Sequence, residues 1–156
     1  MKVLLQRVLR AQVRVEGTVV GAIGQGYVAL IGVGRGDTQA DVEFVARKIA
    51  GLRLWPDEEG KMNRSLVEAV RPAAVLAVSQ FTLLADTRRG MRPSFDAAAG
   101  PEEARPLYEA LVERLRGAGM EVSTGIFQAD MELELINHGP VTIWVESEAS
   151  RGGVAI

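Results

Sequence analysis

The chain contains no cysteine and only one histidine, His138, among its 156 residues. The missing cysteines exclude disulfides, zinc–thiolate sites and cysteine nucleophiles. One histidine cannot supply a two-histidine metal motif, and any Ser-His-Asp triad would have to use His138. No stretch approaches the roughly 20 apolar residues of a membrane-spanning helix. Gln6 and Arg7 interrupt the N-terminal apolar run before it reaches the length of a signal-peptide core. We therefore expect a cytoplasmic protein with no metal, no cofactor and no membrane partner.

The overall composition is that of an ordinary soluble domain. Hydrophobic residues make up 47% and charged residues 24% of the chain, which is typical of globular proteins. The length suits one domain with a proper core. The net charge of −2 provides no global attraction to nucleic acid, so any RNA contact has to come from a local cluster.

Hydrophobic periodicity predicts the secondary structure. Apolar segments at 3–8, 27–33 and 73–84 predict strands, and the last two are nearly continuous, as expected for central strands. The alternating segment 11–24 predicts a β-hairpin. Helical spacing predicts one helix after residue 38 and another from Pro101. We predict a single α+β domain at residues 1–147, with a mixed β-sheet covered by two main helices, and a flexible C-terminal extension at 148–156.

The glycine-rich segment GVGRGD, residues 32–37, joins a predicted strand to a predicted helix. Its glycines recur at every second position, which does not match the G-x-G-x-x-G spacing of dinucleotide-binding loops, and no Lys-Ser/Thr pair follows. We interpret this segment as a tight βα turn.

The segment SQFT, residues 79–82, places polar side chains at the end of a buried apolar stretch. A buried polar group without a partner costs on the order of 1–3 kcal/mol. These side chains are therefore either hydrogen-bonded at an ordinary strand end or exposed in a functional cleft. Thr82 would need an activating base to act as a nucleophile, and Asp86 is the nearest carboxylate in the sequence. The pattern leaves both interpretations open.

A long polar segment follows at residues 86–100, and loops of this length are often functional. It carries Arg88, Arg89 and Arg92 within five residues. Guanidinium groups suit phosphate oxygens. The alternative is a solvated loop whose arginines pair with the neighbouring aspartates.

The segment NHGPVTIW, residues 137–144, combines turn-type residues with a strand-like run. Proline cannot donate a ladder hydrogen bond, so Pro140 belongs at a strand start, an edge or a bulge. The pattern predicts a Gly-Pro turn that leads into a strand at 141–145.

Two motifs together, SQFTLLADTRRGMRPSF at 79–95 and NHGPVT at 137–142, resemble those of the D-aminoacyl-tRNA deacylases. Shorter similar segments are LLQRV at 4–8, VEG at 15–17, GKMN at 60–63 and ADM at 129–131. The resemblance implies a barrel-like sheet and a homodimer whose active sites lie at the subunit interface. Each site would combine SQFT of one subunit with Gly-Pro of the other.

The resemblance also implies a reaction. Such enzymes hydrolyse the ester that links a D-amino acid to the terminal adenosine of tRNA, a chiral proofreading step in translation, and clear glycine misloaded on alanine tRNA. Backbone N–H groups near Gln80, Phe81 and Thr82 would stabilise the oxyanion, and the ribose 2′-hydroxyl would help to activate water. Thr82 as a covalent nucleophile is the alternative mechanism.

The remaining roles follow from the same resemblance. A cis bond between Gly139 and Pro140 would direct two carbonyl oxygens against L-side chains, which is selection by exclusion. Ser79 and Met131 would help to form the substrate pocket, with Met131 against the adenosine, unless Met131 only packs in the core. The Phe81 ring would stack near the adenine or pack in the core. The three candidates for tRNA phosphates are Arg88, Arg89 and Arg92.

Two other classes of protein are compatible with the residue pattern alone. A tRNA-binding module without catalysis would keep the arginine-rich loop and bind without turnover. A structural homodimerisation domain would use the Gly-Pro only as an interface turn and would not bind aminoacyl-tRNA.

Overall fold

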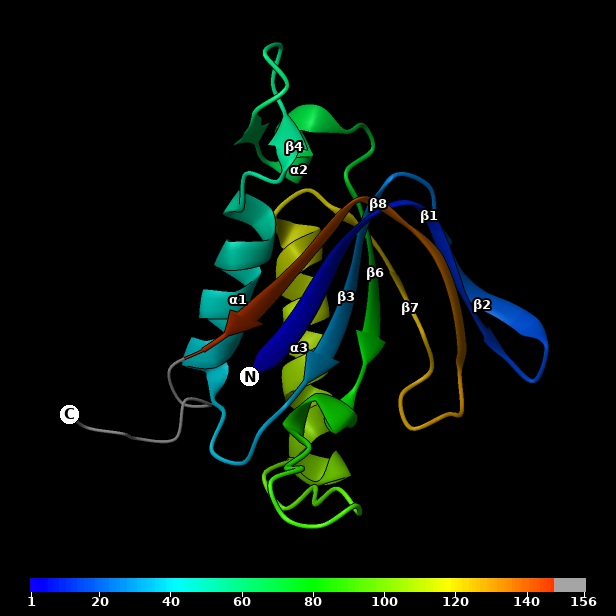
Figure 1. Ribbon diagram of the computed structural model, residues 1–156, viewed down its shortest axis with the longest axis vertical. Helices are drawn as coiled ribbons and strands as arrows, with labels where there is room; N and C mark the ends of the chain where they lie inside the picture. The colour runs from blue at the N-terminus through cyan, green and yellow to red at the C-terminus, as the bar shows by residue number, and fades with distance from the viewer. Residues whose placement is uncertain (148–156) are drawn as a thin grey trace.

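The structure is a computed structural model that describes residues 1–147, so the predicted C-terminal extension at 148–156 lies outside the described residues. A six-stranded mixed sheet curves into a nearly closed barrel (Figure 1). The strand order is β2-β1-β3-β6-β7, and β8 also pairs with β1. The strands are β1 (Lys2–Val15), β2 (Thr18–Ile23), β3 (Gly26–Gly32), β6 (Ala74–Ser79), β7 (Glu121–Thr124) and β8 (Glu132–Glu146). The prediction of one α+β domain with a mixed, barrel-like sheet is confirmed.

Parallel pairing is confined to the β3-β6-β7 part of the sheet. β3 pairs with β6, and β6 with β7, in parallel, whereas every pair made by β1 is antiparallel. The Ser123 hydroxyl of β7 donates a 3.0 Å hydrogen bond to the Ala22 carbonyl of β2, which links the two ends of the strand order. The carboxyl ends of β3 and β6 therefore point to the same end of the barrel.

Two long helices, α1 (Gln39–Gly51) and α3 (Pro101–Gly117), lie side by side against one face of the sheet (Figure 1). They are the two main helices that the periodicity predicts. The short helix α2 (Leu66–Ala69) and a small hairpin of β4 (Trp55–Pro56) and β5 (Met62–Arg64) were not anticipated. None of the helices within residues 1–147 combines the length and the apolar composition needed to cross a membrane.

The apolar faces of these helices form the core with the sheet. Val42, Val45 and Ile49 of α1 are fully buried, as are Leu111 and Leu115 of α3. Each such side chain contributes about 1.5–3 kcal/mol by leaving water. The helices are held against β3 and β6, so the core fixes the strand ends from which the site is built.

The local signals around residues 32–41 are confirmed. Gly34 donates a 2.6 Å hydrogen bond to the carboxylate of Asp37, which makes the segment a tight βα turn. The backbone N–H of Thr38 donates to the Asp41 carboxylate at 2.8 Å, as in a capping box.

The predicted strand at 73–84 is too long. β6 ends at Ser79, and residues Phe81–Leu84 form a 3₁₀ helix, η1. The pairing partner β3 ends at Gly32, directly after the pair Ile31–Ser79. The ladder therefore has no partner beyond Ser79, and the chain turns away from the sheet.

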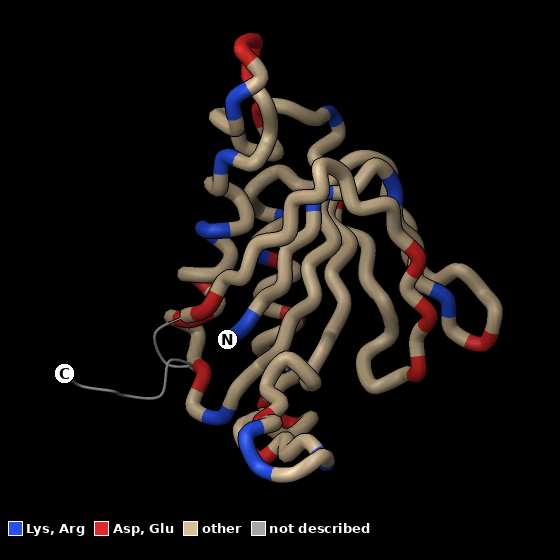
Figure 2. Tube along the Cα trace, in the orientation of Figure 1, with Lys and Arg blue, Asp and Glu red and all other residues tan. Residues whose placement is uncertain are grey.

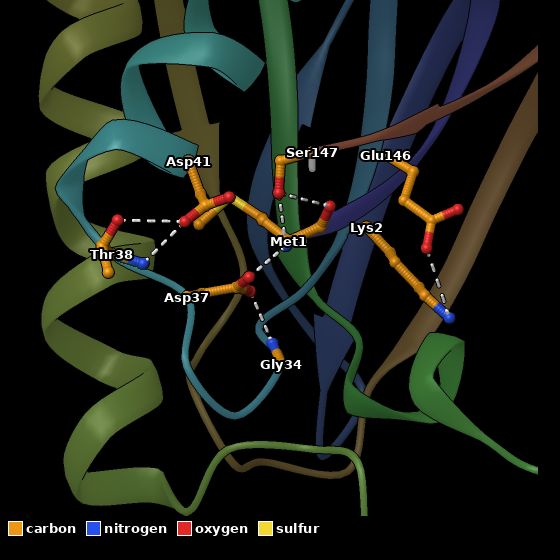
Figure 3. Close-up of polar contacts among 8 residues, drawn as sticks. All are labelled: Met1, Lys2, Gly34, Asp37, Thr38, Asp41, Glu146 and Ser147. Carbon is orange, nitrogen blue, oxygen red and sulfur yellow. Dashed lines mark hydrogen bonds and ion pairs between the residues drawn. The ribbon is translucent and has the colours of Figure 1, made fainter. Parts of the chain in front are cut away.

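The chain's first residue is part of the core. The α-amine of Met1 donates to the Asp37 carboxylate and, at 2.7 Å, to the Ser147 hydroxyl, and Met1 is completely buried (Figure 3). Lys2 forms a further ion pair with Glu146 at 3.7 Å. These contacts fasten the start of β1, the βα turn and the end of β8 to one another.

Candidate active site

A pocket of about 580 Å³ opens where β6 passes into η1. This volume is in the range of small-molecule sites. Ser79, Gln80 and Phe81 line one side, and Met131 lines the other. The structure thus brings together four of the residues predicted for the site, while Thr82 lies one residue beyond the lining.

The opposite wall comes from α3 and from the connection between β7 and β8. It includes Tyr108 and Phe127, whose ring centroids are 5.8 Å apart, and the carboxylate-bearing Asp130. The Tyr108 hydroxyl donates to the Ala77 carbonyl at 3.0 Å, and burial raises the pKa of Tyr108 to about 12. The guanidinium of Arg105 lies 4.6 Å from the Phe127 ring centre.

On this side of the pocket, sequence reasoning identified Met131 but missed Tyr108, Phe127 and Asp130. Tyr108 lies on the apolar face of a helix, where an aromatic residue normally indicates core packing. Phe127 and Asp130 lie in a short connection without periodicity. Only the fold shows that these residues face the Ser79–Phe81 segment.

Backbone donors are available at the start of η1. The N–H of Gln80 is occupied, because it donates to the Ile31 carbonyl at 2.7 Å. The N–H groups of Phe81 and Thr82 have no acceptor among the described residues, as expected for the first positions of a helix. Two of the three predicted donors therefore have an N–H group that no described residue occupies.

The Thr82 hydroxyl has one hydrogen-bond partner, the side-chain amide of Gln80. Within residues 1–147 no carboxylate or imidazole hydrogen-bonds to that hydroxyl. Among the described residues of a single chain, Thr82 therefore has no hydrogen-bonded base that would activate a threonine nucleophile. The same part of the chain contains no group of three or more His, Cys, Asp and Glu side chains that could hold a metal ion.

Gly139 and Pro140 lie in an exposed bulge in the middle of β8. Asn137 pairs with Val8 and Thr142 with Gln6, so residues 138–141 face a single residue of β1. The Asn137 amide donates to the Thr142 hydroxyl at 2.9 Å and closes the base of this bulge. The predicted turn before a strand at 141–145 is wrong in this respect, because pairing with β1 continues on both sides. The peptide bond between Gly139 and Pro140 is cis.

Arg7 supports the bulge from beneath. It is only 7% exposed, and its guanidinium donates to the carbonyl of His138 at 3.2 Å and to the carbonyl of Leu54. The guanidinium carbon also lies 5.4 Å from the Trp55 ring centre, and Trp55 lies 6.5 Å from the His138 ring. No local feature of the sequence distinguishes Arg7 from a surface arginine.

Only glycine fits at position 139 with this backbone. Its φ is +120°, and an added Cβ would lie 2.7 Å from the Arg7 guanidinium and 2.8 Å from a Val141 methyl group. Residue 139 therefore cannot acquire a side chain unless the bulge or Arg7 moves.

One chain does not bring the two motifs together. Ser79 of β6 pairs with Ile31 of β3, which in turn pairs with Val3 of β1. The bulge in β8 lies opposite Arg7 of β1. The two motifs are therefore offset by four residues along β1 and by the three strand spacings from β6 to β8. These offsets correspond to a separation of about 20 Å. His138 accompanies the bulge, so it forms no triad with Thr82 within one chain.

The arginine loop, residues 86–95, follows η1 at the pocket end. Arg88 folds back onto the Asp86 carboxylate, with contacts of 2.9 and 2.6 Å. The Arg88 side chain and backbone N–H hold the pKa of the Asp86 carboxyl well below its usual range. Arg89 and Arg92 are exposed and form no ion pair among the described residues.

Comparisons with known proteins agree with this architecture. The sequence profile of the family described as D-Tyr-tRNA(Tyr) deacylase matches residues 4–146. A D-aminoacyl-tRNA deacylase of Symbiobacterium thermophilum is 60% identical over 148 residues, which cover 95% of this chain and 97% of that protein. The Thermomicrobium roseum protein of the same name is 54% identical over 153 residues, 98% of each chain.

Solved structures show the same fold. The structure titled "c-Myc DNA Unwinding Element Binding Protein" superposes with a TM-score of 0.88 at 39% identity and covers 94% of this chain and 99% of that one. A probable eukaryotic D-amino acid tRNA deacylase, at 17% identity, reaches a TM-score of 0.74, with 92% and 97% of the two chains covered. The chain therefore belongs to the D-aminoacyl-tRNA deacylases, a family of hydrolases that act on aminoacyl-tRNA esters.

Proposed function

We propose that this chain hydrolyses the ester bond of D-aminoacyl-tRNA, and of glycyl-tRNA mischarged on alanine tRNA, and releases the amino acid and the tRNA. The observation that carries the proposal is the pocket beside Ser79–Phe81, where the N–H groups of Phe81 and Thr82 have no acceptor among the described residues. The relatives named D-aminoacyl-tRNA deacylase that align with nearly the whole chain support the choice of ester.

In this proposal the terminal adenosine occupies the pocket against Met131 and Phe127, and Ser79 contacts the substrate. The ester carbonyl oxygen lies against the N–H groups of Phe81 and Thr82. When water attacks the carbonyl carbon, the electron pair moves onto this oxygen, and each donor stabilises it by about 2.7–4 kcal/mol. The intermediate then expels the ribose oxygen, which takes up a proton. The 2′-hydroxyl of the same ribose helps to activate the water.

Chiral selection in this proposal requires a homodimer. The bulge of one subunit enters the pocket of the other, since the two motifs lie about 20 Å apart within one chain. Exposed apolar side chains flank the bulge on β8, with Ile136 at 39% and Trp144 at 47% exposure. Such a surface suits contact with a second copy.

The bulge then acts by exclusion. The carbonyl oxygens of Gly139 and Pro140 occupy the space that the side chain of an L-residue needs, while a D-side chain points away from them. Glycine has no side chain to exclude, so glycyl esters enter the same pocket. In the arginine loop, Arg89 and Arg92 contact tRNA phosphates, and Arg88 holds the loop through Asp86.

The experiment that tests the function compares three substrates: D-tyrosyl-, L-tyrosyl- and glycyl-tRNA. We expect rapid loss of the D-tyrosyl and glycyl esters and survival of the L-tyrosyl ester, unchanged by a metal chelator. If none of the esters is hydrolysed although the tRNA binds, the chain is a binding module. If D- and L-esters disappear equally, the enzyme remains but the bulge has no selective role.

Thr82→Ala separates the two mechanisms. We expect turnover of D-tyrosyl-tRNA to stay within about threefold of the wild type, because the N–H group of residue 82 remains in place. Single-turnover hydrolysis measures this directly. Abolished turnover with intact tRNA binding would instead identify Thr82 as the nucleophile.

A further inference from the structure

The arginine loop has a defined place at the rim of the pocket. Asp86 and Ser94 exchange two backbone hydrogen bonds, of 2.8 and 2.9 Å, which close the loop at its base. The chain beyond it is attached to the end of β3, since Ala99 donates to the Val33 carbonyl at 3.0 Å. Ala99 also lines the pocket, so the loop and the pocket share one supporting segment.

Large apolar side chains are exposed on this loop and beside it. Phe81 is 57% exposed and Phe95 38% exposed, and their rings meet edge to face with centroids 5.1 Å apart. Met91, at the loop tip, is completely exposed. Phe81 also lines the pocket, so the apolar surface continues from the pocket onto the loop.

The charge of the loop is positive. Residues 86–95 contain three arginines and one aspartate, a net charge of +2. The arginines of this loop appear in blue at the lower end of the molecule in Figure 2. Since Arg88 is engaged with Asp86, Arg89 and Arg92 supply the positive charge that remains for a ligand.

We propose that this surface binds the single-stranded nucleotides that precede the terminal adenosine of the substrate. We name it the 3′-end platform and define it as Phe81, Met91 and Phe95 together with Arg89 and Arg92. A base stacks on the exposed rings, and the two guanidinium groups contact the phosphates. The proposal rests on the proposed function, because it requires the terminal adenosine to occupy the pocket.

The chemistry of the surface favours this ligand. Proteins hold single-stranded nucleic acid by stacking bases on aromatic side chains inside a positively charged track. Aromatic, methionine and arginine side chains are also common at protein interfaces, but the pairing of exposed rings with guanidinium groups that form no ion pair among the described residues matches a nucleotide, which offers one base and one phosphate. Phe81 belongs both to the pocket lining and to the 3′-end platform. The nucleotide next to the bound adenosine therefore reaches the platform.

The first test compares two substrates with the wild-type enzyme: D-tyrosyl-tRNA and the D-tyrosyl ester of adenosine, which lacks the preceding nucleotides. We expect KM for the adenosine ester to be at least fivefold higher, the lower limit for stacking of one base. Equal KM values would overturn the platform and leave the proposed function intact. Hydrolysis of neither substrate would overturn the proposed function itself.

The second test uses the variant Met91→Ala/Phe95→Ala. We expect KM for D-tyrosyl-tRNA to rise about tenfold, with kcat unchanged and no change in KM for the adenosine ester. Met62→Ala is the matched control, because Met62 is 56% exposed in β5, away from the pocket. Phe95→Leu keeps apolar bulk without a ring, and we expect it to show most of the loss even if the double variant folds poorly.

Two other results of the double-variant experiment would give the 3′-end platform a different role. An equal rise in KM for both substrates would make Phe95 a support of the pocket wall. Loss of the dimer in the double variant would make the surface a subunit interface. Each of these results would overturn the platform.

The arginines are tested by salt dependence. Each phosphate of a single strand that a protein neutralises contributes roughly 0.7 to the slope of log affinity against log salt. For D-tyrosyl-tRNA and Arg89→Gln/Arg92→Gln, we therefore expect the slope of log KM against log salt to fall by about 1.4. Arg47→Gln/Lys48→Gln on α1 is the control with the same charge change. An unchanged slope of log KM against log salt in the loop variant would show that Arg89 and Arg92 do not contact phosphates.

Discussion

Residues 79–82 lie at the end of a buried parallel strand, whereas residues 138–141 project from the middle of a long antiparallel strand. The first segment is held by backbone bonds to β3 and by the core beneath it. The second is held by one buried side chain, Arg7, and by the absence of a side chain at Gly139. Rigid backbone placement suits a group that stabilises charge, while a projecting bulge suits a group that excludes a shape. We therefore expect damage to the first segment to lower turnover and damage to the second to lower selectivity.

The largest effect is expected from Gly32→Ala, which disturbs the pocket segment. An added Cβ at Gly32 would lie 2.9 Å from the Gln80 carbonyl oxygen and 2.5 Å from a Leu84 methyl group. The start of η1 has to shift, and misplacement of catalytic groups by about 1 Å can cost on the order of 100-fold in rate. We expect kcat for D-tyrosyl-tRNA to fall by about that factor.

Gly51→Ala is the control for this substitution, because nothing lies within 4 Å of a Cβ added at Gly51. Thermal unfolding of both variants separates a local shift from loss of the fold. Wild-type kcat in a folded Gly32→Ala protein would contradict the role of the Gln80–Thr82 backbone.

A smaller effect, on selectivity alone, is expected from Gly139→Ala. The new methyl group collides with Arg7 and Val141, so the bulge is displaced and its carbonyl oxygens leave the position from which, in the proposed function, they exclude L-side chains. We expect the ratio of kcat/KM for D- over L-tyrosyl-tRNA to fall about tenfold or more, while turnover of the D-ester changes little. Unchanged selectivity in a folded variant would remove the bulge from chiral selection.

Mixing the Gly32→Ala and Gly139→Ala proteins tests whether the pocket segment and the bulge act in the same site. In the proposed dimer, a pair made of one Gly32→Ala and one Gly139→Ala subunit has one site that combines an intact pocket with the partner's intact bulge. Refolding the two together should restore selective hydrolysis at up to half of the sites formed in mixed dimers. If mixing restores nothing, the two motifs do not act across a subunit interface.

The smallest perturbation is the removal of one tyrosine hydroxyl, either near the bulge or in the pocket wall opposite residues 79–81. Tyr27 packs against Trp55 under the bulge, and Tyr108 lines the pocket. Burial raises the pKa of each to about 12, from an ordinary value near 10. Both hydroxyls therefore stay protonated in the folded protein at a pH where the unfolded chain loses those protons. The stability they contribute is full below pH 10 and is lost as the pH rises toward 12.

Tyrosinate absorbance measures this titration, because the chain contains only these two tyrosines. Tyr27→Phe and Tyr108→Phe should each remove about half of the late absorbance change. A tyrosine that titrates near its ordinary pKa would show that its segment opens to water more readily than the other.

The parts of the fold that were predictable have strong local signals. The helix after Thr38 has a capping residue and apolar residues at helical spacing, and the helix from Pro101 has proline at its first position. The β4–β5 hairpin and α2 were missed because segments of two to four residues have no measurable period. The Gly-Pro was interpreted as a turn because its local composition is that of a turn, while the long pairing of β8 with β1 is set by distant residues.

The site was predictable only in part, for a similar reason. Ser79, Gln80, Phe81 and Met131 were identified through the family resemblance, and they do meet at one pocket. Arg7 and Tyr108 carry no local signal, since a buried arginine and a pocket tyrosine have the same sequence context as ordinary strand and helix residues. Their roles arise from contacts with residues 131 and 31 positions away.

The buried amine of Met1 has a practical consequence for anyone who prepares this protein. A formyl group, an acetyl group or a fused purification tag would turn the ammonium into a neutral amide and take away the charge that pairs with Asp37. It would also add atoms at a residue with no exposed surface. We therefore expect a blocking group on this nitrogen to loosen the contacts that join Met1 to Asp37 and Ser147.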